Sequence, residues 1–541
     1  MRYGFIIDNR KCIGCHACTT ACKAEHLVPL GVNRTWVKQV EKGEFPNTRR
    51  LFSVMRCNHC TEAPCVEICP VEALFFREDG IVDFDNRRCI GCKSCMQACP
   101  YDALYIDPEN HTAAKCNYCS QRVDIGLEPA CVNVCPEHAI ISGDMENPDT
   151  EIAQLLAREQ VTARKVSKGT VPNLFYINGD EASLTPSLTE RSNEYFWNSQ
   201  SLGVGHYAKE AEKLAFSNGD AIQALMQSNG QAATAGEVAQ NGPSKSIDLM
   251  LGKPRRIYDT PEKGVLWGWE VSGYVLTKAI SAGAFLVPFL SLVSGAAQPG
   301  LNNVWWGLGL ALVFLGATGA LLVKDLDRPD RFLNVLLRPQ WGSWLVRGGY
   351  AISVYGALIA LNGLFLLLNI RVLEMALIWV TAIAAVIVAI YTAFLFAQAK
   401  GRDFWQSPAL SLHMLVHSVM AGAAAFGILS FFQDAQADWT RFLITVLIAG
   451  LSVNLFTIIL EIVTPHPTVD AKAVVKMIVK GRYRRLFWFG VMAFGNILPL
   501  VLLSAAGSEP MVLAASGLVV LIGIYLTEHI WVEAPQRIPL V

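Results

Sequence analysis

The segments CIGCHACTTAC (residues 12–22) and CIGCKSCMQACP (residues 89–100) share the cysteine spacing C-x2-C-x2-C-x3-C. Two further segments, CNHCTEAPCVEICP (residues 57–70) and CNYCSQRVDIGLEPACVNVCP (residues 116–136), keep the opening C-x2-C and the closing C-x3-C-P around a longer spacer. Together the four segments hold all 16 cysteines of the 541-residue chain. They are therefore variants of one motif, and no cysteine is left over.

Cysteines at this spacing are typical of iron–sulfur proteins. Three thiolates on a tight loop can bind three irons of one 4Fe-4S cluster, while the fourth, on the helix that follows, reaches a neighbouring cluster. Four groups of four thiolates predict four 4Fe-4S clusters. Disulfide frameworks are typical of short secreted chains, and zinc sites need only one or two C-x2-C pairs, so both alternatives are disfavoured. The predicted iron ligands are Cys12, Cys15, Cys18, Cys22, Cys57, Cys60, Cys65, Cys69, Cys89, Cys92, Cys95, Cys99, Cys116, Cys119, Cys131 and Cys135.

The motif order predicts a duplicated domain. The first and third motifs share one spacing and the second and fourth share another, so we expect an α+β domain built as a duplicated bacterial ferredoxin. Residues 1–150 carry 16 Lys and Arg against 20 Asp and Glu, which is the wrong sign for nucleic-acid binding. The first cysteine, Cys12, leaves no room before it for an export signal, so the domain is expected to stay in the cytoplasm or to be exported with a partner.

Composition changes after the last motif. The apolar run within GTVPNLFYINGD (residues 169–180) predicts an extended segment. Residues 198–246 are rich in Ala, Gln, Asn, Gly and Ser, which predicts a polar linker with some helix at residues 208–228. We therefore expect three parts: a cluster domain (1–190), a linker and docking segment (191–262) and a membrane domain (263–541).

The C-terminal half is predicted to be an all-α integral membrane domain. Hydrophobic residues make up 52% of the chain and charged residues only 17%. Apolar runs of about 20 residues are long enough to cross the hydrocarbon core of a bilayer. Eight such runs predict eight transmembrane helices, at residues 267–293, 303–323, 348–369, 374–397, 409–432, 440–463, 486–505 and 511–532.

Charge predicts the orientation of these helices. An even number of spans returns the chain to the side of the clusters, and the segments on that side carry 18 Lys and Arg. The opposite side carries only Arg371 and Arg441. The positive-inside rule then places the clusters on the cytoplasmic face of a bacterial inner membrane. Docking of these cations on the acidic cluster domain is the alternative explanation.

The motifs also carry a family resemblance. Residues 1–190, with their four cysteine motifs, resemble the four-cluster iron–sulfur subunit of the polysulfide and dimethyl sulfoxide reductase family. The segments DLDRPDRFLNVLLRPQWGSWLVR (325–347) and DFWQSPALSLHMLVHSVMAG (403–422), together with eight spans, resemble the haem-free, quinone-interacting membrane subunit of that family. Because these subunits are normally separate chains, this chain is similar to a natural fusion of the two.

The resemblance implies how the motifs pair and which partners the chain has. In that family the outer two motifs share clusters with each other, and so do the inner two. The implied ligand sets are Cys12, Cys15, Cys18 and Cys135; Cys116, Cys119, Cys131 and Cys22; Cys57, Cys60, Cys65 and Cys99; and Cys89, Cys92, Cys95 and Cys69. The resemblance further implies an electron-transfer and membrane-anchor subunit of a respiratory oxidoreductase. Its electrons would pass between the quinone pool (menaquinone or ubiquinone) and a separate molybdopterin subunit with molybdenum or tungsten.

A quinone site needs groups that exchange protons, because quinone takes up two electrons and two protons. An ionisable residue in hydrocarbon costs about 2.5–3.5 kcal/mol unless it is paired or solvated, so such residues in the spans are candidates. His413 and His417 share one face near the cluster-side end of the fifth span, and histidine titrates near neutral pH. The predicted quinone-site residues are His413, His417, Glu270, Tyr274, Lys278, Asp325 and Arg328, while Glu461, Glu528 and Asn454 are further polar residues of the spans.

Each of these residues also has a structural interpretation. The two histidines could bond loop carbonyls, Lys278 could form an interhelical pair, and Asp325, Arg328 and Arg331 could brace a loop. A haem is not expected, because a transmembrane haem normally needs histidines on two helices. Two other functions stay open for the membrane half: a redox-linked, proton-translocating module of a larger complex, and a passive anchor.

Overall fold

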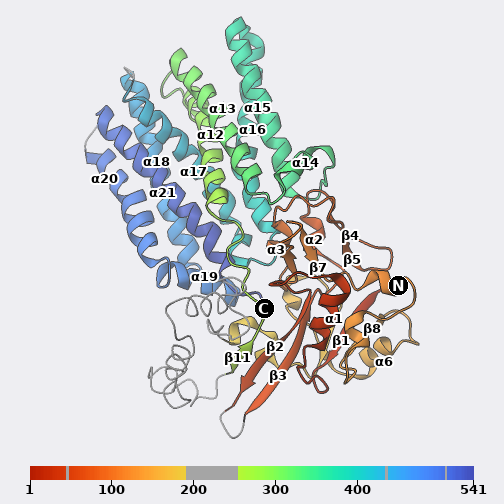
Figure 1. Cartoon of the computed structure of the whole chain (residues 1–541). Coiled ribbons are helices and arrows are strands. Elements are labelled where there is room, and N and C mark those ends of the chain that lie inside the picture. Colours follow the sequence, from red (N-terminus) through yellow and green to blue (C-terminus); the bar gives the residue numbers. More distant parts are fainter. Residues whose placement is uncertain (44–47, 190–253, 433–435, 506–508) are drawn as a thin grey trace, which may run out of the picture.

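The computed structural model describes residues 1–43, 48–189, 254–432, 436–505 and 509–541. It contains two parts, which we call the cysteine domain (residues 1–189 with 254–262) and the helical domain (residues 263–541). Figure 1 shows residues 1–189 of the cysteine domain, coloured red to yellow, against one end of the green-to-blue helices. The predicted linker at 198–246, with its helix at 208–228, lies outside the described residues.

The cysteine domain is built from short elements between its motifs. Its helices are α1 (Ala17–His26), α2 (Pro64–Glu67), α3 (Ser94–Ala98), α4 (Ser120–Val123), α5 (Ala130–Asn133), α6 (Glu151–Arg158) and α7 (Glu181–Leu184). Its strands are β1 (Tyr3–Asp8), β2 (Thr35–Lys42), β3 (Arg49–Arg56), β4 (Leu74–Phe76), β5 (Val82–Phe84), β6 (Leu104–Ile106), β7 (Ala113–Lys115), β8 (Ile140–Asp144), β9 (Val161–Thr162), β10 (Leu174–Ile177) and β11 (Arg255–Tyr258). The first three motifs contribute one short helix each, α1, α2 and α3, and the fourth contributes two, α4 and α5.

Four small sheets frame the cysteines. One sheet has the order β8-β1-β10-β9, and β1 pairs in parallel with β10 so that Phe5 lies opposite Leu174. This strand confirms the extended segment predicted at residues 169–180. The hairpins β4-β5 and β6-β7 follow the second and third motifs, which gives the domain the repeated α+β organisation predicted for a duplicated ferredoxin.

The described end of the predicted linker docks on the cysteine domain. Strand β11 pairs antiparallel with β2 in the sheet β11-β2-β3. Arg256 is 1% exposed and its guanidinium lies 2.8 Å from the Asp259 carboxylate, so a buried ion pair fixes the strand. The chain is therefore paired with the cysteine domain shortly before it enters the helices.

The helical domain contains the eight predicted spans. They are α12 (Trp269–Ser294), α13 (Leu301–Lys324), α15 (Trp344–Leu368), α16 (Arg371–Gln398), α17 (Ala409–Leu429), α18 (Ala437–Val463), the π-helix η5 (Leu486–Ile497) continued by α20 (Leu498–Ala505), and α21 (Pro510–Gln536). All eight are long and apolar enough to cross a membrane. The connections on the side of the cysteine domain carry η3 (Pro329–Arg331), α14 (Asn334–Leu337), η4 (Asp403–Gln406) and α19 (Val469–Val479).

Helix α12 is the centre of the helical domain, packing against α13, α16, α17 and α21. Its contact with α17 is very close, because Gly283 faces Gly422. A Cβ atom at Gly283 would lie 1.9 Å from the Ser418 carbonyl oxygen, so no larger side chain fits there. Small residues allow such close helix contacts in membranes. This packing brings polar side chains of α12, α17 and α21 into one layer.

The two domains meet through polar contacts at the third motif. Gln97 donates to the Gln536 side chain over 2.6 Å, and Arg402 donates to Gln97 over 2.9 Å. The Asp327 and Arg328 amides donate to the Gly91 and Ile90 carbonyls. All four contacts join a loop or helix end of the helical domain to the segment that contains Cys89, Cys92, Cys95 and Cys99.

Candidate functional site

In the cysteine domain, each of two groups of four cysteines lines a cavity of its own. Site one has an empty volume of about 340 Å³ and is lined by Cys12, Cys15, Cys18 and Cys135. Site three, of about 310 Å³, is lined by Cys57, Cys60, Cys65 and Cys99. In both, three cysteines come from one motif and the fourth from a motif distant in sequence.

The remaining eight cysteines form two more groups of the same kind. At site two, Cys22 lies near Cys116, Cys119 and Cys131. At site four, Cys69 and Cys89 lie near Cys92, and Cys95 lies near all three. The structure thus brings the 16 cysteines together in the four groups that the family resemblance implies.

The four sites form a row. Cys18 of site one lies near Cys131 of site two, and Cys57 of site three lies near Cys116 of site two. Cys65 of site three is close to Cys95 of site four. Site one is at the surface, where Cys15 is exposed, and site four adjoins the helical domain.

The chemistry of the donor set fits iron–sulfur clusters. All sixteen cysteines are free thiols, and only Cys15 is exposed. Burial raises the pKa of the Cys18 thiol to about 12 and that of Cys99 to about 11. A buried thiolate therefore needs bound cations to stabilise its charge, which iron would provide.

An aromatic series leads from site four into the helical domain. The Trp267 indole donates to the Cys92 carbonyl over 3.2 Å, and its ring stacks on Trp405 at a centroid distance of 5.6 Å. The Trp405 indole donates to the Trp531 carbonyl, and the Trp531 ring lies 5.5 Å from the His413 ring. All four side chains are at most 4% exposed. This series joins the last cysteine site to the predicted histidines without crossing solvent.

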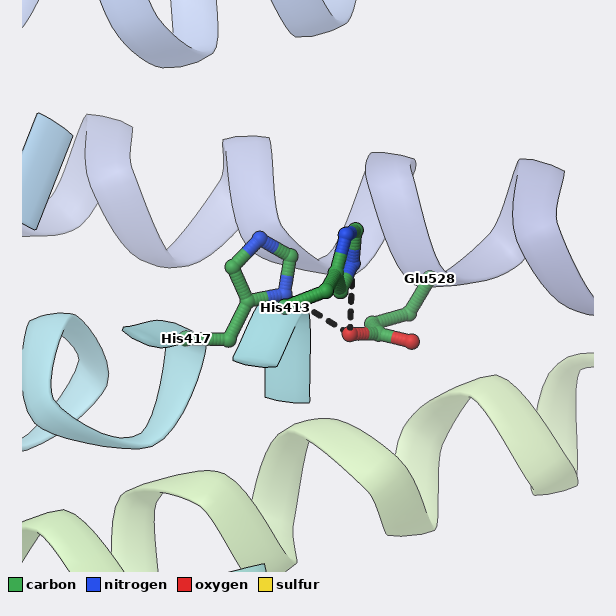
Figure 2. Close-up of side chains that lie close together, drawn as sticks. All are labelled: His413, His417 and Glu528. Atoms are coloured by element: carbon green, nitrogen blue, oxygen red, sulfur yellow. Dashed lines mark hydrogen bonds and ion pairs between the residues drawn. The ribbon is translucent and has the colours of Figure 1, made fainter. Parts of the chain in front are cut away.

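The predicted histidines share a buried carboxylate (Figure 2). His417 Nδ1 lies 2.7 Å and His413 Nε2 lies 3.4 Å from the same oxygen of Glu528. All three side chains are 1% exposed. The sequence placed Glu528 only among the further polar residues of the spans, and the structure puts it in contact with both histidines. Helix α21 continues to Gln536, past the predicted end at residue 532, so Glu528 lies two turns inside the packed bundle.

Two asparagines extend this group along the membrane interior. His417 Nε2 lies 3.1 Å from the Asn454 side-chain oxygen, and Asn454 donates to Asn496 over 2.8 Å. Both ring nitrogens of His417 therefore face oxygen atoms, so the ring can hold a second proton between Glu528 and Asn454. Sequence reasoning missed Asn496. Its signal was an amide within an apolar run, and it lies in the π-helix η5, a local irregularity frequent at functional sites.

Lys278 and Tyr274 form a second polar group on α12. The Lys278 ammonium donates to the Thr392 hydroxyl over 2.6 Å and lies 4.8 Å from the centre of the Tyr391 ring. Tyr274 also lies against Thr392. Lys278 therefore makes an interhelical contact, and its partners are a hydroxyl and an aromatic face of α16. Among the described residues, no carboxylate lies within 4.0 Å of the Lys278 nitrogen.

The three other predicted residues lie at the boundary of the two domains. The Glu270 carboxylate is 3.9 Å from Lys324. The Asp325 carbonyl accepts a hydrogen bond from Lys93, and burial raises the pKa of the Asp325 carboxyl to about 7. Arg328 pairs with Asp330 and donates to the Asn110 carbonyl of the cysteine domain, so its contacts are those of a docking residue.

Comparisons with known proteins identify relatives of the cysteine domain. Over 200 residues, 36% of this protein, it is 44% identical to a subunit of the tetrathionate reductase of Salmonella typhimurium, of which the match covers 80%. Over 181 residues, 32% of this protein, it is 42% identical to a polypeptide of the polysulfide reductase of Wolinella succinogenes, of which the match covers 94%. Over 208 residues, 33% of this protein, it is 37% identical to a protein of Halobacterium salinarum named as a dimethyl sulfoxide reductase iron-sulfur subunit. The match covers 79% of that subunit.

Family comparisons cover both halves of the chain. Two families described as "4Fe-4S dicluster domain" match residues 11–74 and 48–145. The family described as "Polysulphide reductase, NrfD" matches residues 260–536, more than half of the chain. The protein is thus a multi-pass membrane protein that fuses an iron–sulfur subunit with the membrane subunit of reductase complexes, an organisation suited to electron transfer. It belongs to the polysulphide reductase NrfD family and carries 4Fe-4S dicluster domains on the same polypeptide.

Proposed function

We propose that this chain passes electrons between the quinone pool and a separate molybdopterin catalytic subunit, through four 4Fe-4S clusters. The observation that carries the proposal is the row of four cysteine sites, which runs from the exposed Cys15 to Cys92 beneath Trp267. Bound at these sites, the clusters would supply one-electron transfer. The proposal also divides the chain into a cluster domain (1–190), a linker and docking segment (191–262) and a membrane domain (263–541).

The proposed ligands are the four groups as they lie together. Each would bind one cluster with three cysteines of one motif and one cysteine of a distant motif. Backbone amides already point at several of the sulfurs, as in the 3.2 Å contacts from Ala139 to Cys135 and from Ala73 to Cys69. These groups are preorganised for negatively charged thiolates, which supports metal binding over free thiols.

The surface around site one suits a protein partner. Ile13, which lines site one beside Cys15, is 55% exposed. A partner that covered this apolar side chain and the exposed Cys15 would lie next to site one. The relatives named above are parts of reductases, which implies a catalytic partner, and we propose that it carries molybdopterin and docks on this surface.

At the other end, we propose that quinone reacts near site four and the buried polar residues. His413, His417, Tyr274 and Lys278 would exchange or stabilise the protons of the quinone head group, with Glu528 holding the two histidines. Residue His417 lies eight residues into α17, about 12 Å from the end that faces the cysteine domain. Glu270 and Asp325 would connect this layer with the aqueous side, and Arg328 would hold the two domains together.

Asp325 gives the reaction a predicted pH dependence. Because burial raises its pKa to about 7, the carboxyl is protonated below that pH and can accept a quinol proton only above it. Quinol-driven reduction of the clusters should therefore rise as pH increases through about 7, and Asp325→Asn should flatten this rise. Stopped-flow reduction rates across that range provide the measurement. An unchanged pH profile in Asp325→Asn would remove Asp325 from the proton path.

We further propose that the clusters face the cytoplasm across a bacterial inner membrane. All native cysteines are predicted ligands, so single new cysteines report the orientation cleanly. Gln298, in the loop between α12 and α13, and Lys472, on α19, are exposed on opposite sides of the helical domain. A membrane-impermeant maleimide should label Gln298→Cys but not Lys472→Cys in spheroplasts, because Lys472 would be cytoplasmic. The opposite labelling pattern would place the clusters outside.

Purification of the tagged chain in mild detergent tests the whole proposal. Mass spectrometry and metal analysis should find a large molybdenum- or tungsten-containing partner, and a quinol analogue should reduce the clusters. A multihaem cytochrome in its place would make the chain an intermediate relay.

The membrane half has a second candidate function, redox-linked proton translocation. The contacts from His417 to Asn454 and Asn496 favour it, because they extend the proton-exchanging group beyond the layer that a quinone reaction requires. Proton movement across sealed vesicles during quinol oxidation separates the two functions, since the first function alone moves no proton through the helical domain.

A further inference from the structure

Two buried cations precede the two motifs that begin C-N-x-C. Arg56 stands directly before Cys57 in RCNHC, and Lys115 stands directly before Cys116 in KCNYC. Arg56 is 1% exposed and Lys115 is 0% exposed. Full burial of a charged side chain is costly unless an opposite charge compensates it, so both cations require a partner.

Each of these cations contacts the middle cysteine site that does not include the cysteine next to it in the sequence. Arg56 adjoins Cys57 of site three in sequence, but its Nη2 donates to the sulfur of Cys131 in site two over 2.8 Å. Lys115 adjoins Cys116 of site two in sequence, but its ammonium lies against the Cys57 thiol of site three. Arg56 therefore contacts site two and Lys115 contacts site three, the reverse of what their positions in the sequence indicate.

The remaining contacts of these cations are uncharged. Arg56 also donates to the Thr35 hydroxyl over 3.2 Å, and its guanidinium lies 4.2 Å from the centre of the Phe5 ring. Lys115 donates to the Val82 and Cys116 carbonyls. In the part of the chain that the structure describes, no carboxylate lies within 4.0 Å of either cation. Their compensating charge is therefore that of the cysteine sites.

The two terminal sites differ in this respect. The hydrogen bonds to their sulfurs come from backbone amides, as at Cys135, Cys69 and Cys89. Arg56 acts on Cys18 of site one only through its charge at longer range. Within the described residues, a buried Lys or Arg lying against a ligand sulfur is thus confined to sites two and three.

We propose that Arg56 and Lys115 hold the two middle clusters at higher reduction potentials than the two terminal ones, so that the row stores two electrons at its centre. The potential of a 4Fe-4S cluster depends on net charge and on hydrogen bonds to its sulfurs. One-electron reduction adds one negative charge, and a fixed cation in a medium of low dielectric constant stabilises that charge strongly. The inference rests on the proposed function for its four clusters.

The two electrons that the middle clusters would store equal the number that one quinol donates. One quinol gives up two electrons and releases two protons as it becomes quinone. Arg56 and Lys115 would each stabilise one of these electrons, and the pair would leave together when the catalytic partner reduces its substrate by two electrons. The terminal sites would then receive and release electrons at lower potential.

Redox titration of the purified full-length chain, followed by electron paramagnetic resonance, tests the proposal. Arg56→Gln should lower the equilibrium constant for reduction of one cluster at least tenfold, about 59 mV for a one-electron couple. Lys115→Gln should lower that of a different cluster by a similar factor. Arg56→Lys keeps the charge and should keep the potential. Arg87→Gln, whose side chain is 91% exposed two residues before Cys89, is the matched control and should shift no cluster.

The possible outcomes distinguish a failure of this proposal from a failure of the proposed function. Fewer than four cluster components in the unmodified chain would overturn the ligand sets. Four components whose potentials are unchanged in both glutamine variants would overturn the role of Arg56 and Lys115 alone, and so would equal shifts of the same component by both. If Arg56→Gln binds less iron, Arg56→Lys and Lys115→Gln still decide the matter, because each keeps a hydrogen-bond donor at its site.

Discussion

Glu528→Gln is expected to abolish the reduction of the clusters by quinol while leaving the cluster spectra unchanged. Glu528 carries the negative charge between His413 and His417, at 3.4 and 2.7 Å, and a neutral amide cannot stabilise a proton on either ring. His413→Ala and Glu270→Gln should impair the same step. The measurement is the rate of cluster bleaching after a quinol analogue is mixed with the oxidised protein.

The control for this prediction lies on the same helix. Glu533 pairs with His529 at the edge of the bundle and is 14% exposed, so Glu533→Gln changes the same functional group outside the histidine cluster. It should keep most of the quinol reactivity. Dithionite, which reduces the clusters without the membrane half, should act equally on all variants. Normal quinol rates in both Glu528→Gln and His413→Ala would rule out the proposed quinone site.

Alanine substitutions of ligands are expected to remove clusters in a pattern that does not follow the motifs. Cys22 belongs to the first motif by sequence but lies with Cys116, Cys119 and Cys131 at site two. Cys22→Ala and Cys119→Ala should therefore lose the same cluster component, whereas Cys22→Ala and Cys12→Ala should lose different ones. Each variant should lose up to four irons and interrupt electron transfer to the partner, because the row then has a gap.

Iron analysis and paramagnetic resonance spectra of the three variants provide the measurement. Matching losses in Cys22→Ala and Cys12→Ala would show that the first motif holds one cluster by itself, which would overturn the exchange of ligands between motifs. Arg87→Gln again serves as a substitution that should leave all components in place.

Local chemistry was readable from the sequence. The cysteine spacing specified the kind of cofactor, because the ligands of one cluster lie mostly within one short loop. The eight spans were equally clear, since hydrocarbon requires about 20 consecutive apolar residues whatever their neighbours are. The resemblance to a fused iron–sulfur and membrane subunit rested on these two features and on the segments at 325–347 and 403–422, and the comparisons confirmed it.

Contacts between residues distant in the sequence could not be predicted from these local patterns. Nothing near Glu528 in sequence indicates that it meets His413, because the contact depends on how α21 packs against α17. Arg56 and Lys115 stand beside one cysteine site in the sequence and contact another in space. Spacing along the chain determines which groups can share a loop. Only the packing of distant elements determines which charges share a low-dielectric interior, and therefore which of them can hold a proton or favour an electron.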